Sequence, residues 1–145
     1  MTDVDEIDHR LLALLQQDGR RTYSDMAAIV GLSVAAVKRR VDRLQETGVI
    51  TGFTVQVDHR RLGWGVEAFT ELRYAGTTGV ADIVATATTV PEVQAVYTIA
   101  GDPDALVQVR VRDVPHLQQV IDRLRNAGPI AGTKTLLVLG AWNRS

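Results

Sequence analysis

The sequence has 145 residues, with 16 Lys and Arg against 17 Asp and Glu, so its formal net charge is −1. Hydrophobic residues make up 46% and charged residues 23%, which is typical of a folded protein and excludes a disordered or collagen-like chain. The sequence has no apolar run of about eighteen residues for a membrane span, and its acidic N-terminus is unlike a signal peptide. It also has no cysteine, which excludes disulfides and thiolate metal sites. Together these features favour a cytoplasmic protein.

The clearest break in the sequence is the segment from His59 to Gly65, where two glycines interrupt any periodic pattern. The length of the chain allows two small domains. We therefore predict one domain over residues 1–60 and a second over residues 61–145.

The first domain is predicted to contain three helices and a hairpin. Residues 7–15 carry an apolar stripe at helical spacing, and a second helix is expected to begin after Thr22. Residues 31–33 form a tight glycine turn, in which Ser33 can cap a third helix. The alternating, β-branched residues 49–58 predict a small hairpin. This order is typical of a winged helix-turn-helix domain.

The second domain is predicted to follow the order βαββαβ. Strands are expected over residues 66–74, 92–99, 105–111 and 133–139, and helices over residues 77–89 and 114–127. This order is typical of a ferredoxin-like fold, in which helices cover one face of an antiparallel sheet and the other face is free. The fold class of the whole chain is therefore α+β. Because a free apolar sheet face usually finds a partner, we expect a homodimer.

The net charge is an average, because the third helix is cationic although residues 1–61 hold nine basic and nine acidic residues. Small residues at the start of this helix would let it approach base edges, and its Lys and Arg side chains would neutralise phosphates. We therefore predict that it enters the major groove of double-stranded DNA. The expected contact residues are Arg20, Arg21, Ser33, Ala35, Ala36, Lys38, Arg39, Arg40 and Arg43. The alternative is a solvated charged face.

The loop from Ala100 to Asp104 is the second candidate site. Its two carboxylates could receive an ammonium group, and Gly101 would let a ligand approach the backbone. Threonine hydroxyls nearby could bind the carboxylate of the same ligand. The expected effector-binding residues are Thr98, Ala100, Gly101, Asp102, Asp104, Thr133 and Thr135. The alternative is a plain β-turn, because Asp, Pro and Gly are common turn residues.

The sequence gives no support for an enzyme, a metal site or a cofactor. His9, His59 and His116 are far apart, and no catalytic or metal-binding spacing accompanies them. We interpret the first two as surface residues and His116 as a capping or surface residue. A small enzyme that uses Asp102 and Asp104 remains an alternative, although no third partner is evident.

Several spaced motifs resemble the Lrp/AsnC (feast/famine) family of transcription regulators. They are Asp8-x-x-Leu11-Leu12-x-x-Leu15-Gln16-x-Asp18-Gly19-Arg20, Gly31-Leu32-Ser33, Arg39-Arg40-Val41-x-x-Leu44-x-x-x-Gly48-Val49-Ile50-x-Gly52, Val57-Asp58, Leu62-Gly63, Gly101-Asp102-Pro103-Asp104 and Thr133-Lys134-Thr135. The resemblance implies a DNA-binding dimer, often assembled into an octamer. It also implies an amino acid effector, or a related small molecule, bound near the Gly101–Asp104 loop where adjacent dimers meet.

The function expected from residues and resemblance together is sequence-specific transcription regulation in response to an amino acid or related metabolite. The alternative is a ligand-binding or oligomerisation module that acts without an effector or without specific DNA binding.

Overall fold

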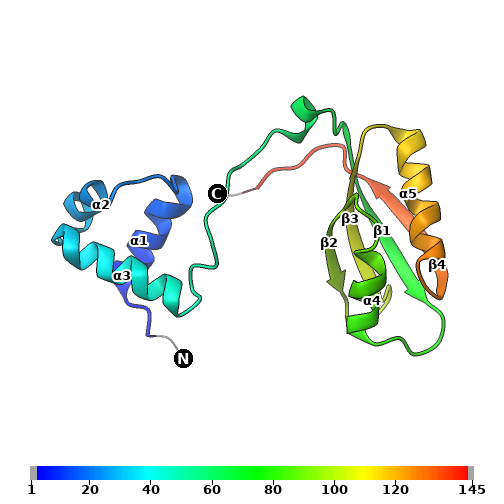
Figure 1. The fold of residues 1–145 in the computed structure, drawn as a ribbon, viewed down its shortest axis with the longest axis horizontal. Coiled ribbons are helices and arrows are strands. Elements are labelled where there is room, and N and C mark those ends of the chain that lie inside the picture. The colour runs from blue at the N-terminus through cyan, green and yellow to red at the C-terminus, as the bar shows by residue number, and fades with distance from the viewer. Residues whose placement is uncertain (1–2, 144–145) are drawn as a thin grey trace. The chain divides into compact units, whose positions relative to one another are not determined.

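The computed structural model describes residues 3–143, which divide into two compact units (Figure 1). The first unit extends to Gln56, and the second runs from Val57 to Trp142. The structure thus divides the chain slightly before the boundary after residue 60 that the glycine pattern predicts. Within the described residues, no helix is long and apolar enough to cross a membrane.

Three helices form the first unit: α1 (Glu6–Gln17), α2 (Tyr23–Val30) and α3 (Val34–Glu46). Each begins after a residue whose side chain accepts a backbone N–H of the first turn, and these caps are Asp5, Thr22 and Ser33. Gly31 ends α2 with a φ of 74°, a conformation that glycine adopts without strain, so the chain can turn directly into α3. The predicted helix-turn-helix is confirmed.

One apolar core holds these three helices together. Leu11, Met26 and Val37 contribute from one helix each, and all three side chains are fully buried. Full burial of one such side chain stabilises a fold by roughly 1.5–3 kcal/mol. The positions of α1, α2 and α3 are therefore fixed by the apolar stripes visible in the sequence.

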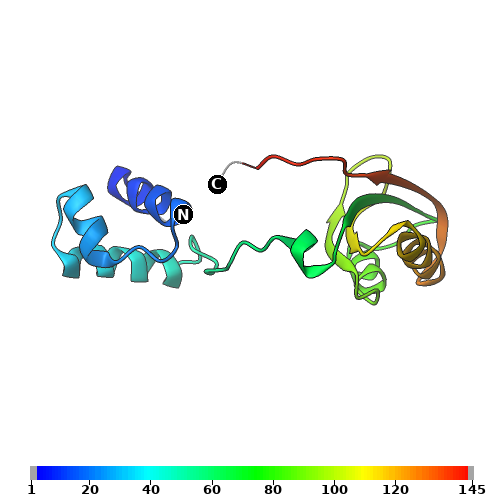
Figure 2. The same cartoon turned by 90° about the horizontal axis from the view of Figure 1, so that it is seen from above.

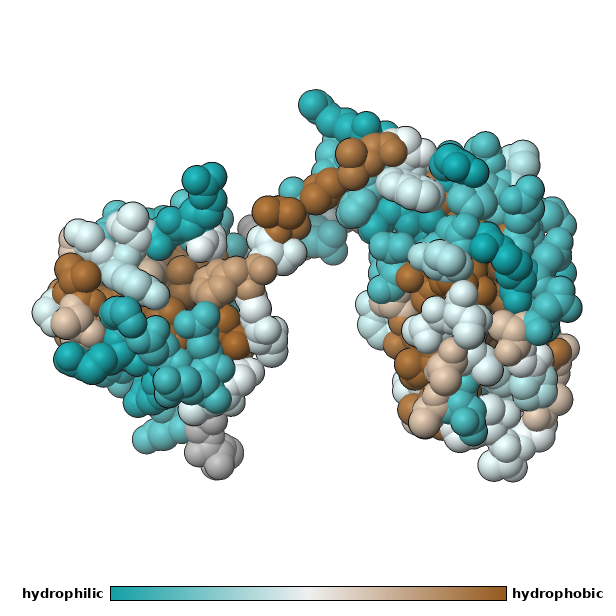
Figure 3. Space-filling view, viewed as in Figure 1, coloured by the Kyte–Doolittle hydropathy of each residue, from teal (hydrophilic) through white to brown (hydrophobic). Residues whose placement is uncertain are grey.

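The hairpin predicted over residues 49–58 is wrong for this structure, because the described chain has no strand in this segment. Its alternating apolar side chains point into solvent, with Phe53 51% exposed and Val55 78% exposed. Figure 3 shows that apolar residues also reach the surface outside the helices and strands. A two-stranded hairpin without a third strand is marginally stable, so alternation alone did not suffice to form one. The helix-turn-helix therefore has no wing in the single chain.

The second unit has the predicted βαββαβ order. After a short 3₁₀ helix, η1 (His59–Leu62), the elements are β1 (Val66–Tyr74), α4 (Val80–Ala87), β2 (Val93–Thr98), β3 (Ala105–Val111), α5 (Val114–Asn126) and β4 (Ile130–Leu137). The strands form one antiparallel sheet in the order β2-β3-β1-β4. This confirms the predicted α+β class.

Both helices cover the same face of this sheet, as the two views show (Figures 1 and 2). The two faces of the sheet differ in burial, as β3 shows. Fully buried residues face the helices, and they are Ala105, Val107, Val109 and Val111; the residues between them face the other side and are half-buried. On the open face, Tyr97 lies opposite Leu106, and Phe69 lies opposite Leu136. The open face therefore has an apolar centre.

Candidate functional site

Helix α3 presents a face of small and cationic residues to solvent. Its apolar stripe, Val37, Val41 and Leu44, is buried in the first unit. Ala35 and Arg39 are exposed and lie one turn apart on the opposite side of the helix. A helix face that begins with small residues and continues with a guanidinium can approach a base pair edge and a phosphate together.

The four cations of α3 have different surroundings. Lys38 pairs with Asp42 one turn later at 2.6 Å, which raises the pKa of the Lys38 ammonium through the hydrogen bond and the opposite charge. Arg40 and Arg43 both bind carboxylates of the α1 N-terminus. Arg39 is exposed and makes no ion pair with any residue that the structure describes. Its guanidinium is therefore available to a ligand.

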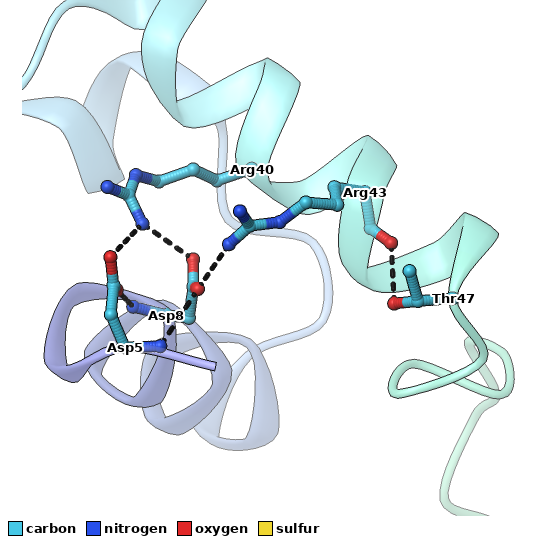
Figure 4. Close-up of polar contacts among 5 residues, drawn as sticks. All are labelled: Asp5, Asp8, Arg40, Arg43 and Thr47. Carbon is cyan, nitrogen blue, oxygen red and sulfur yellow. Dashed lines mark hydrogen bonds and ion pairs between the residues drawn. The ribbon is translucent and has the colours of Figure 1, made fainter. Parts of the chain in front are cut away.

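Asp8 is the residue that joins α1 to the cationic helix (Figure 4). Its side chain is fully buried; one oxygen accepts a hydrogen bond from Arg40 at 2.9 Å, and the other accepts one from Arg43. Asp5 adds a second carboxylate, 2.7 Å from the same Nη1 of Arg40. The backbone N–H of Asp8 and the Arg40 guanidinium together lower the pKa of Asp5. These two carboxylates fix two guanidiniums of α3 in place.

Sequence reasoning missed this role of Asp8. A signal was present, because Asp8 lies one turn before Leu11 and Leu12 on the apolar side of α1, where a carboxylate needs a partner. The partner could not be identified, because Arg40 and Arg43 lie 32 and 35 residues away in the chain.

A shallow hollow of about 340 Å³ lies along the flank of α3. It is lined by Leu32, Ala36, Arg39, Arg40 and Arg43. Four of the nine predicted DNA-contacting residues therefore border one space. Outside α3, Arg20 is exposed, while Arg21 pairs with Asp25 at 2.7 Å.

The loop after β2 is held by its second carboxylate. Asp104 accepts a hydrogen bond from the backbone N–H of Tyr74 at 2.8 Å, and its own N–H donates to the carbonyl of Leu72. Asp102 is 76% exposed and lies 2.7 Å from the Nε of Arg73. Ala100 and Gly101 are exposed, and Gly101 has a φ of 123°. Asp104 thus joins the loop to β1, and Asp102 faces solvent beside a guanidinium.

The three predicted threonines do not gather at this loop. Thr98 ends β2, just before the loop, whereas Thr133 and Thr135 lie on β4, the opposite edge strand. The hydroxyl of Thr135 is 3.0 Å from that of the buried Thr70, and the hydroxyl of Thr133 accepts a hydrogen bond from Arg125. Sequence reasoning also missed the contact between Arg73 and Asp102, because no local motif indicates it.

The sequence predicts that His116 is a capping or surface residue. Its side chain is buried, so the surface interpretation is wrong, whereas its ring does accept a backbone N–H at the start of α5, as a capping residue would. Its Nδ1 accepts the backbone N–H of Arg112 at 3.2 Å, and its Nε2 lies 2.9 Å from Glu92. Burial raises the pKa of Glu92, but hydrogen bonds from Arg123 and His116 outweigh this and lower it to about 2. The ring of Trp64 lies 6.3 Å from that of His116. This cluster fastens the start of β2 to α5.

In the part of the chain that the structure describes, no three His, Asp or Glu side chains lie close enough together to bind a metal ion.

Comparisons with known proteins match both units to domains of the same family. An AsnC-type helix-turn-helix domain matches residues 4–45, and an Lrp/AsnC ligand binding domain matches residues 67–145. The HTH-type transcriptional regulator Rv2324 of Mycobacterium tuberculosis is 37% identical over 96% of this chain and 94% of its own length. AldR of Mycolicibacterium smegmatis, another HTH-type transcriptional regulator, is 35% identical over 94% of this chain and 81% of its own.

Solved structures give the same result. The feast or famine regulatory protein Rv3291c of M. tuberculosis, in complex with L-methionine, superimposes with a TM-score of 0.90 at 30% identity, covering 98% of this chain and 96% of that one. Escherichia coli AsnC superimposes with a TM-score of 0.91 at 26% identity, covering 99% and 98%. This chain therefore belongs to the Lrp/AsnC family of HTH-type transcriptional regulators.

Proposed function

We propose that this protein is a cytoplasmic, sequence-specific DNA-binding regulator whose activity responds to an amino acid or a related small metabolite. The observation that carries the proposal is the solvent-facing surface of α3, with Ala35 and Arg39 in line and the hollow beside them. A helix of this kind, at the second position of a helix-turn-helix, reads the major groove.

The N-terminal half of α3 lies nearest the base edges in this proposal. Ser33, Ala35 and Ala36 are small enough for close approach, while Lys38 and the three arginines of α3 supply positive charge to the phosphates. Arg20 and Arg21, in the turn before α2, contact flanking phosphates. Specificity then comes from the first turns of α3, and most of the salt-sensitive affinity comes from its guanidiniums.

The working form is a homodimer that forms through the open face of the sheet. Phe69, Tyr97, Leu106 and Leu136 supply the apolar centre. Two charged groups on this face already pair, since Arg110 lies 3.3 Å from Glu67, and Gln108 donates a hydrogen bond to the same carboxylate at 3.0 Å. Their burial against a second copy therefore leaves fewer unpaired polar groups. Each dimer presents two α3 helices to two DNA half-sites, whose centres are separated by about one turn of the DNA helix or a multiple of it. Four such dimers assemble into an octamer.

The effector binds at the loop from Ala100 to Asp104. Asp102 and Asp104 offer carboxylate oxygens to an ammonium group, Gly101 allows close approach, and Thr98, at the end of β2, is the candidate partner of the ligand carboxylate. The support comes from a relative, because Rv3291c was solved with L-methionine. Thermal-shift titration against the twenty amino acids tests the proposal, since a ligand that binds the folded state raises Tm.

DNA binding is tested by selection of duplexes from a random-sequence library with the full-length protein, followed by anisotropy titrations at several salt concentrations. Enrichment of a two-part motif supports the proposal. The alternative function, a ligand-binding module without specific DNA binding, predicts no enriched motif, and that result would refute the proposed function.

A further inference from the structure

We propose that the hollow on the flank of α3 is a binding site for a single phosphodiester of the DNA backbone, formed by Arg39, Arg40 and Arg43. This inference rests on the proposed DNA-binding function and deepens it, because it assigns three guanidiniums to one phosphate and gives the two carboxylates beneath them a purpose.

The first support is the position of the three guanidiniums. Arg39, Arg40 and Arg43 border the same hollow of about 340 Å³, whose other walls are the small Ala36 and the apolar Leu32. Because Ala36 is small, an anion of phosphate size can approach α3 closely between the longer side chains. Arginine is well suited to this role, since its planar group donates several N–H groups to phosphate oxygens.

The second support is the anchoring of two of these side chains. Arg40 contacts Asp5 and Asp8 through Nη1, and Arg43 contacts Asp8 through Nη2 (Figure 4). A guanidinium has five N–H donors, so each keeps donors for a ligand. Asp8 is fully buried and satisfied on both oxygens, so it holds the arginines in position before DNA arrives. Preorganisation of this kind lowers the entropy cost of binding.

The third support is the local charge. Three guanidiniums stand against two carboxylates, those of Asp5 and Asp8, which leaves one positive charge. A backbone phosphodiester carries one negative charge. The neighbouring Lys38 lies beside Asp42, and the charges of these two side chains sum to zero, so they leave the balance of the hollow unchanged. The net charge of the site therefore matches that of a phosphodiester.

The salt dependence of DNA binding tests the number of phosphates that these arginines neutralise. The slope of log K against log salt decreases in magnitude by about 0.9 for each phosphate that the protein no longer neutralises. We expect Arg39→Gln to lower the slope of binding to a mixed-sequence duplex by about 0.9, and the double variant Arg39→Gln/Arg43→Gln to lower it no further. Glutamine at position 43 keeps an N–H donor for Asp8. Arg112→Gln, which removes an exposed charge directly after β3, is the matched control and should leave the slope unchanged.

A second experiment locates the phosphate. In a duplex selected by the wild-type protein, single phosphodiesters are replaced in turn by neutral methylphosphonates. A methylphosphonate at one position should reduce the affinity of the wild-type protein about tenfold. On the duplex with that substitution, Arg39→Gln and Arg43→Gln should bind as tightly as the wild-type protein.

The outcomes separate this inference from the proposed function. Three results would overturn the single-phosphate site and leave DNA binding intact. The slope of the double variant could fall by about 1.8, the losses of the two single variants could map to different methylphosphonates, or the variants could bind like the control. A wild-type protein that shows no salt-dependent binding to any duplex would overturn both.

Discussion

Replacement of Asp8 by Ala should severely destabilise the first unit. The substitution removes a fully buried carboxylate that accepts hydrogen bonds from Arg40, Arg43 and the backbone N–H of Asp5. A hydrogen bond to a charged group contributes about 1.5–3 kcal/mol. The freed arginines, which are 26% and 47% exposed, can turn into water, and the cost of burying the carboxylate disappears. We therefore expect a net loss of about 2–3 kcal/mol.

Thermal unfolding followed by circular dichroism measures this loss. For a unit of this size, 2–3 kcal/mol corresponds to a fall in Tm on the order of 10–20 °C. Asp5→Ala is the matched control, because Asp5 caps α1 and contacts the same Arg40 from a side chain that is 49% exposed, and we expect it to cost less stability than Asp8→Ala. An Asp8→Ala protein no less stable than Asp5→Ala would refute the idea that burial makes Asp8 the stronger link.

Three further predictions concern the second unit. The pKa of Glu92 is lowered to about 2 from an ordinary 4.5, so its ion pairs stabilise the fold fully above pH 4.5 and this stabilisation is lost as the pH falls towards 2. In an acid titration, the Glu92→Gln variant should not show this pH-dependent loss of stability. Tyr97→Asp places a charge on the open sheet face, so light scattering should report a shift from dimer to monomer. Asp104→Ala should abolish any amino-acid-dependent rise in Tm and leave basal DNA affinity unchanged; a normal ligand response would show that the loop is only a turn.

Local and periodic features of the fold could be predicted from the sequence. The caps Thr22 and Ser33 and the alternation of β3 each depend on residues close together in the chain, and the structure confirms them. The segment 49–58 shows the limit of this reasoning, because alternation predicts a strand only where another strand is available to pair with it.

The candidate site could be predicted only in outline. The sequence identified α3 as the cationic helix, but the pairing of Arg40 and Arg43 with Asp8 depends on how α1 packs against α3. The same holds for the loop, where Arg73 meets Asp102 only because β1 ends beside it. Long-range ion pairs leave no periodic trace, so residue type and spacing cannot distinguish a free guanidinium from an anchored one.

The strand order β2-β3-β1-β4 also has a consequence for synthesis on the ribosome. Strand β1 is made early but lies between β3 and β4, and β4 is not complete until Leu137. All helices of the first unit are complete by Glu46, so the contacts among them form within a short early stretch of the chain. Since local contacts form faster than distant ones, the helix-turn-helix can fold during translation, whereas the sheet must wait for nearly the whole chain.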